Sequence, residues 1–382
     1  MVWVGGIPTP CKSTETAMAL SYADFKHQLK DVGDPLADEV VTQLLDAGQV
    51  NTVNEVFRQI STADSAIPAD APAVLRDYMQ STRQFPSWVK EGELARTAAF
   101  FGRYQGEAAT LQATAGLVGT YLSPMGAKTL DSTHVLRQPH RRLSQSTRLF
   151  VGMGNEDAFT PHSKLVPTCQ KVRLIHAAIR QLHLRSGQWD QASDGMPVSQ
   201  LYTAGAALVF SIGILDAMHN LGYRVTPDDA EGFYYAWRIV AHFLGVPDDI
   251  LPEGYQQGRT LWHEARPHEW ASSPEGINLT RECIELYQGY VGVPGAVAAF
   301  LRLALGDTYA DMMKIPRNAV LDPVATIGGL FNKVVSATPL YETPPVKTVL
   351  GELSNAVQEV SIRAFTHGQE TEPQMADRIV AR

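Results

Sequence analysis

The chain has 382 residues, of which 45% are hydrophobic and 19% are charged, with a formal net charge of -8 at pH 7. This composition is typical of a soluble globular protein with a large core, and the length favours one large domain with additions, or two. The acidic balance, without a basic stripe, excludes nucleic acid as the expected partner. The cysteines, Cys11, Cys169 and Cys283, are too few and too scattered for a disulfide framework or a zinc site, and a single bridge is the alternative that they leave open.

Apolar residues recur at three- and four-residue steps along most of the chain, which predicts helices. Few stretches alternate with period two, and there is no repeat of fixed length. The predicted helical stretches are, in order, several pieces within residues 20–60, then 93–105, 108–121, 140–151, 167–187, 198–222, 227–244, 295–305 and 346–366. We therefore expect a single all-α domain over residues 1–382, with a polar end that is mobile.

Two stretches of this pattern allow more specific expectations. The most apolar one, residues 204–215, ends at Asp216 and is too short to span a bilayer, so we expect a buried helix and no transmembrane segment. Small residues recur at helical spacing within residues 108–121, namely Ala109, Ala113, Gly116 and Gly119. They would allow another helix or a flat ring to approach closely, and tight helix packing is the more common use.

Residues 167–187 (PTCQKVRLIHAAIRQLHLRSG) form a predicted helix with clear boundaries. Pro167 and Thr168 mark its start, with Thr168 as the expected N-cap, and Gly187 marks its end. An apolar stripe with the spacing of a buried helix face runs between them, formed by Val172, Ile175, Ile179 and Leu182. We therefore expect this helix to be largely buried.

His176 lies beside this stripe, with Arg173 three residues before it and Arg180 four residues after it. On a helix, this spacing places one imidazole and two guanidinium groups on the same face. A heme would match such a face, because its iron takes a neutral imidazole nitrogen and its propionates suit bidentate arginine. A second interpretation stays open, in which His176 is a hydrogen-bonded histidine of the core or surface and the arginines are solvated.

The stretch RLIHAAIR around His176 resembles the heme-ligating core of the latex-clearing protein family, the heme b rubber oxygenases, and of their wider MpaB-type relatives. Three further stretches fit the family's pattern in the same order. They are Arg141-Arg142-Leu143 with Ser146, the run from Trp237-Arg238-Ile239 to Gly245-Val246-Pro247, and Ile315-Pro316-Arg317. Each motif is short, but their order, and the family's distance from Arg142 to His176, extend the resemblance over roughly residues 85–335.

The resemblance implies a globin-like helical core with additional helices at both ends. It implies heme b as cofactor, with His176 as the iron ligand. Arg173 and Arg180 are then expected to pair with the heme propionates, and Arg317 is a weaker candidate for the same role.

In the family, the positions of Arg142, Gln145 and Ser146 line the oxygen-binding side of the heme as arginine, lysine and threonine. This chain keeps the arginine, has the smaller Ser146, and has Gln145 where the lysine can occupy the sixth coordination site. Because a glutamine amide is uncharged and a poor iron ligand, we expect the resting iron to be five-coordinate or capped by water. The family's upstream carboxylate has Asp131 as its nearest candidate, and a solvated loop aspartate is the alternative.

The implied function is a heme b dioxygenase that uses O2 to cleave the double bonds of poly(cis-1,4-isoprene) into aldehyde and ketone ends. A related heme mono-oxygenase or peroxygenase acting on a smaller isoprenoid or lipid is the alternative. Composition alone would also allow an all-α interaction scaffold without a cofactor. The expected partner is thus a hydrophobic polymer or isoprenoid substrate, and the chain is expected to be a monomer.

The first residues bear on localisation. Residues 1–16 contain no basic run followed by an apolar core, so no signal peptide is recognisable. Bacterial rubber oxygenases are generally exported with a twin-arginine leader. The resemblance therefore implies a secreted protein whose leader is absent from this chain, and a cytoplasmic protein is the alternative.

Overall fold

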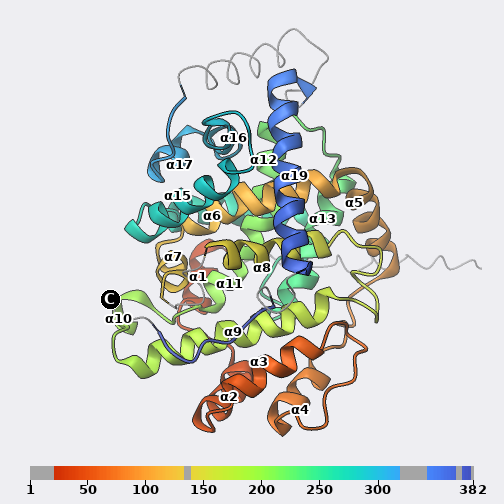
Figure 1. Cartoon of the computed structure of the whole chain (residues 1–382), viewed down its shortest axis with the longest axis vertical. Helices are drawn as coiled ribbons and strands as arrows, with labels where there is room; N and C mark the ends of the chain where they lie inside the picture. Colours follow the sequence, from red (N-terminus) through yellow and green to blue (C-terminus); the bar gives the residue numbers. More distant parts are fainter. Residues whose placement is uncertain (1–20, 133–138, 319–341, 367–371, 380–382) are drawn as a thin grey trace, which may run out of the picture.

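The computed structural model describes residues 21–132, 139–318, 342–366 and 372–379 (Figure 1). The regular elements among these residues are all helical, which confirms the all-α prediction. In chain order they are α1 (Tyr22–Leu29), α2 (Pro35–Asp46), α3 (Val50–Gln59), α4 (Ala73–Ser81), α5 (Glu91–Leu111), η1 (Gln112–Gly116), α6 (Leu117–Tyr121), α7 (Pro124–Leu130), α8 (Pro139–Gly152), α9 (Leu165–Ser186), α10 (Gln191–Asp194), α11 (Gln200–Leu208), η2 (Val209–Gly213), α12 (Ile214–Asn220), α13 (Pro227–Phe243), α14 (Tyr255–Glu269), α15 (Pro274–Gln288), α16 (Ala296–Leu305), α17 (Asp307–Met312) and α19 (Pro344–Thr366).

The larger of two hydrophobic cores is centred on α5 and α13, which pack most extensively against each other. Gly232 of α13 allows this approach, because a Cβ atom there would lie 2.6 Å from the carbonyl carbon of Arg96 in α5. The adjacent Thr97 hydroxyl donates a hydrogen bond of 2.8 Å to the backbone oxygen of Gly232. The two backbones are therefore in direct contact at this point.

Two π-helical turns, η1 and η2, pack against each other within this core. A Cβ atom on Gly116 would lie 2.8 Å from the ring of Phe210, and one on Gly119 would lie 2.8 Å from Val209. The small residues of this stretch therefore serve tight packing of helix on helix, the more common of the two uses expected.

The helical stretch Gln200–Asn220 runs through α11, η2 and α12. Among the described residues it is the one segment long and apolar enough to cross a membrane, and 67% of its apolar window is buried inside the protein. The prediction of a buried helix over residues 204–215 is confirmed.

α9 lies between the central helices and a smaller layer formed by α2, α3 and α4 (Figure 1). Leu174, Ala177 and Ala178 belong to the second hydrophobic core, which they share with residues of that layer. On other sides α9 contacts α8 and α13. This position makes α9 the connection between the two cores.

The boundaries of α9 agree with the prediction at one end only. Gly187 follows the helix in the left-handed conformation, with φ of 67°, as expected of a C-terminal glycine. The predicted N-cap at Thr168 is wrong, because the helix begins at Leu165 and the Ser163 hydroxyl accepts bonds from the first backbone N–H groups. Pro167 is compatible with this earlier start, since the first-turn N–H groups have no intrahelical partner.

α19 packs along α8 and α5 and confirms the helix predicted over residues 346–366. The expectation of a mobile end is wrong for residues 372–379, which return to the body of the protein. The side chains of Met375 and Ala376 are buried there. We call residues 372–379 the C-terminal segment.

Candidate functional site

His176 lies in the middle of α9, and its surroundings favour the neutral imidazole. The side chain is half-buried, and its Nδ1 atom is fully buried without a hydrogen-bond partner among the described residues. Burial lowers the pKa of His176 to about 4, helped by the charge of Arg180 and opposed by Asp34. A neutral imidazole with an unpaired nitrogen can act as a metal ligand, so the chemistry of this residue would suit the iron of a heme.

Arg173 and Arg180 are held by carboxylates of α2. Arg173 donates from Nε and Nη2 to the two carboxylate oxygens of Asp34, over 2.5 and 2.8 Å. Arg180 donates from Nε to Asp38 over 2.8 Å, and from Nη1 to the backbone oxygen of Val198. Asp34, the N-cap of α2, and Asp38 within α2 thus supply both charges with partners, and the expected pairing with propionates stays a prediction.

Arg142 of α8 is a fixed and nearly buried cation, with 4% of its surface exposed. Its Nη2 atom donates to Glu282 of α15 over 3.2 Å, and its guanidinium lies 5.7 Å from the ring centroid of Tyr121. Burial alone would lower the pKa of Arg142, but Tyr121 and Glu282 outweigh it and raise the pKa above its usual value. The group therefore remains charged, and its place beside bound oxygen stays a prediction.

Ser146 and Gln145 follow Arg142 on α8 and are both half-buried. The Ser146 hydroxyl donates to the backbone oxygen of Arg142 over 3.2 Å, within the helix. The Gln145 amide donates from Nε2 to the backbone oxygen of Glu372 over 3.1 Å. The side-chain amide of Gln145 is thus hydrogen-bonded to the segment that contains Glu372. The sequence did not indicate this contact.

Arg317 lies on the surface beside α17. Its side chain is 59% exposed and pairs with Asp311 over 2.8 Å and with Asp307 over 3.6 Å. The structure therefore places its charge beside two exposed aspartates of α17. Asp131, the other peripheral candidate, is the C-cap residue that follows α7.

A buried ion-pair cluster joins α8, α9 and the C-terminal segment, and the sequence analysis missed it. Lys171 is 2% exposed and donates to the backbone oxygen of Ile60 over 2.7 Å and to the Glu372 carboxylate over 3.0 Å. Arg148 of α8 binds the other oxygen of that carboxylate. One signal was available, since Lys171 precedes Leu174 by one helical turn on an apolar face, where a lysine needs a partner.

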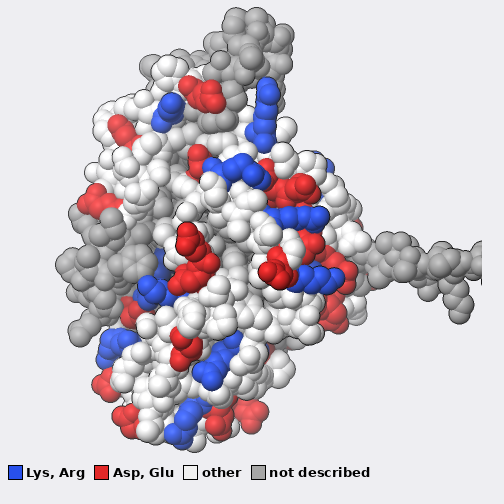
Figure 2. Space-filling view, turned by 90° about the vertical axis from the view of Figure 1, so that its right-hand side faces the viewer, with Lys and Arg blue, Asp and Glu red and all other residues white. Residues whose placement is uncertain are grey.

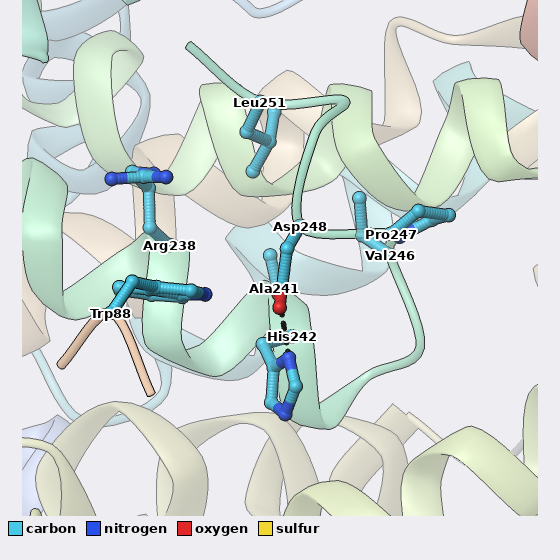
Figure 3. Close-up of a pocket in the computed structure, with 8 residues that line it drawn as sticks. All are labelled: Trp88, Arg238, Ala241, His242, Val246, Pro247, Asp248 and Leu251. Atoms are coloured by element: carbon cyan, nitrogen blue, oxygen red, sulfur yellow. Dashed lines mark hydrogen bonds and ion pairs between the residues drawn. The ribbon is translucent and has the colours of Figure 1, made fainter. Parts of the chain in front are cut away.

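A small pocket lies where α13 ends and includes residues of the third sequence motif (Figure 3). The Arg238 guanidinium lies 4.6 Å from the ring centroid of Trp88, and His242 Nδ1 lies 2.6 Å from an oxygen of Asp248. The pocket is lined by Trp88, Arg238, Ala241, His242, Val246, Pro247, Asp248 and Leu251. These contacts fix the loop after α13, which gives the motif a structural role.

Comparison with known proteins identifies the chemistry that these helices carry. Residues 93–331 match the family model described as "ER-bound oxygenase mpaB/B'/Rubber oxygenase, catalytic domain". The chain is 30% identical over 350 residues to a rubber oxygenase of Streptomyces sp. (strain K30), which covers 88% of this chain and 84% of that protein. The fold is similar to the structure of latex clearing protein LCP in the closed state, with a TM-score of 0.74 and 25% identity over 87% of this chain and 91% of that one. The chain therefore belongs to the family of MpaB-type and rubber oxygenases, and it is an oxygenase.

Proposed function

We propose that this oxygenase uses heme b and O2 to cleave the double bonds of poly(cis-1,4-isoprene). Family membership supports the oxygenase reaction, and the name of the Streptomyces relative supports the polymer as substrate. The observation that carries the cofactor is His176, whose neutral imidazole has a buried nitrogen without a partner in the described part of the chain.

His176 would hold the heme from α9, and the heme would supply the iron at which O2 binds. Arg173 and Arg180 would act mainly through α2, by fixing the helix that carries the ligand. Each also has a guanidinium nitrogen, Nη1 of Arg173 and Nη2 of Arg180, that makes no hydrogen bond with the described residues. These two nitrogens are the donors that a propionate would use.

Arg142 and Ser146 would face bound oxygen from α8. A fixed cation in a dry site stabilises charge that develops on oxygen, and the burial of Arg142 meets this requirement. Gln145 would not serve as an iron ligand, because its amide is uncharged and is bound to the backbone oxygen of Glu372. In the cleavage itself, one atom of O2 enters the aldehyde and the other enters the ketone, so no external electron donor is consumed.

The cofactor is tested by comparing two histidine variants of the same helix. His176→Ala should be purified largely without heme and should lack the Soret band of the wild type, because the iron loses its ligand. His183→Ala is the matched control, since His183 lies two helical turns further along α9 and should keep its heme. A full Soret band in His176→Ala would refute the assignment.

The substrate is tested by product analysis with purified protein, latex and ¹⁸O2, without a reductant. We expect chains that end in one aldehyde and one ketone, each with one labelled oxygen. The alternative is a mono-oxygenase or peroxygenase acting on a smaller isoprenoid, and it draws on Ser146 and Gln145, which stand where the family resemblance implies a threonine and a lysine. It predicts inactivity on latex, and a need for an electron donor or a peroxide with small isoprenoids.

A further inference from the structure

The C-terminal segment is attached at two points to the helices that carry the candidate site. It passes along α9 in Figure 1, although both α8 and α9 lie far from it in the sequence. Its first attachment is Glu372, which contacts α8 and α9 together. Its second attachment is Met375, three residues further on.

Glu372 bridges a cation of α8 and a cation of α9. One carboxylate oxygen accepts from Arg148, and the other accepts from Lys171 over 3.0 Å. All three side chains are largely buried, with exposed fractions of 14% for Arg148, 2% for Lys171 and 13% for Glu372. Without the carboxylate, two poorly solvated cations would repel each other across the helix pair, which is unfavourable where water is excluded. Glu372 therefore supplies a charge-assisted link between α8 and α9 at this point.

Met375 fixes the direction of the segment. The backbone N–H of Met375 donates to Asn54 Oδ1 over 2.8 Å, and Asn54 Nδ2 donates to the backbone oxygen of Met375 over 3.2 Å. Its side chain is 2% exposed and lies in the hydrophobic core that α9 shares with α2, α3 and α4. The attachment at Glu372 is thus part of an ordered path and not an isolated surface contact.

We propose that Glu372 is a positioning residue of the oxygenase, which sets the spacing of α8 and α9 and thereby fixes Arg142 and Ser146 relative to His176. The geometry supports this role twice, because the Glu372 carboxylate joins the two helices and its backbone oxygen binds the Gln145 amide. Loss of the charge would release the segment, separate the two helices and weaken the hold of His176 on the heme. The proposal rests on the proposed function, which assigns the heme ligand to α9 and the residues of the oxygen-binding side to α8.

The test uses the full chain and the isosteric change Glu372→Gln. Hydrogen–deuterium exchange of residues 372–379 in the heme-free protein reports release of the segment, and it should accelerate about tenfold or more, because buried charge-assisted hydrogen bonds are among the strong ones. Transfer of heme to excess apomyoglobin reports the site, and it should accelerate about threefold or more. Glu39→Gln is the matched control, because Glu39 is exposed and has no ion pair in the described structure.

Each result decides one part of the proposal. Faster exchange with faster heme loss supports it, and Glu372→Asp, which keeps the charge on a shorter side chain, should then recover part of both effects. Unchanged exchange in Glu372→Gln would show that the carboxylate does not hold the segment. Faster exchange with unchanged heme loss would show that Glu372 holds the C-terminal segment in place but does not position the heme site. If the wild type bound no heme, the proposed function would fail, while the exchange experiment would still decide the role of Glu372 in holding the segment.

Discussion

At the scale of single residues, His176 makes the heme-free protein sensitive to mild acid. Its pKa is about 4 in the folded protein, and a histidine of an unfolded chain has a pKa of about 6.5. Between these two values the unfolded chain binds a proton that the folded chain does not bind, so the free energy of unfolding falls as the pH falls. The loss from near pH 7 to near pH 5 should be about 2 kcal/mol.

Urea unfolding of the heme-free wild type and of His176→Gln at the two pH values measures this contribution. The glutamine variant should lose less stability than the wild type over the same range, because it has no imidazole to protonate. An equal loss in both proteins would show that His176 is solvated in the folded state and that its pKa is ordinary.

The sequence could propose the residues of the candidate site, but it could not predict their partners in the fold. Spacing alone placed Arg173, His176 and Arg180 on one helix face, because 3.6 residues per turn is a local property. The bidentate partner of Arg173 is Asp34, 139 positions away, and nothing in the local pattern indicates which carboxylate will arrive there. Lys171 gave a partial signal, since a lysine on an apolar face requires a partner, but the sequence could not identify Glu372.

At the scale of elements, two ion pairs join α2 to α9. Asp34 is 5% exposed, binds Arg173 through both oxygens and also serves as the N-cap of α2, where it accepts from the Ala37 N–H. Asp34→Asn keeps a good N-cap but leaves the Arg173 guanidinium without its counter-charge. We expect the free energy of unfolding to fall by about 3 kcal/mol, as is usual when one partner of a buried pair is removed.

Urea denaturation measures this change, and an exposed pair provides the control. Glu285→Gln removes the partner of Arg281 in α15, where both side chains are more than half exposed, and should change the stability by less than about 0.5 kcal/mol. Arg173→Met introduced beside Asp34→Asn should recover part of the loss, because the stranded charge is then removed. Similar small losses in Asp34→Asn and Glu285→Gln would show that the buried pair contributes no more than a surface pair.

The existence of the helices followed from their apolar periodicity, whereas their irregular features depended on tertiary contacts. The helix over residues 346–366 was predicted within two residues of its start at Pro344. The π-helical turns were not foreseen, because their widened geometry accompanies the packing of Gly116 on Phe210. The C-terminal segment was misjudged for the same reason, since its polar composition conceals the burial of Met375.

At the scale of the whole molecule, the net charge of -8 does not produce a single acidic patch on the face seen in Figure 2. Lysine and arginine alternate there with aspartate and glutamate. Many of the cations contact carboxylates of other elements, as Arg173 does with Asp34 and Lys171 with Glu372. The charges of this protein therefore hold helices together, and the proposed substrate, an uncharged hydrocarbon, requires no charged surface to attract it.

The described surface also leads us to predict a monomer. Among the described residues, four large apolar side chains expose more than a third of their surface, and these are Val32, Leu36, Leu184 and Val293. A stable homodimer usually buries about 800 Å² on each partner around an apolar centre. Four side chains at 37% to 44% exposure supply too little apolar area for such a centre. Light scattering at micromolar concentration should therefore give the mass of one chain in low and in high salt, and a dimer that persists on dilution would contradict this.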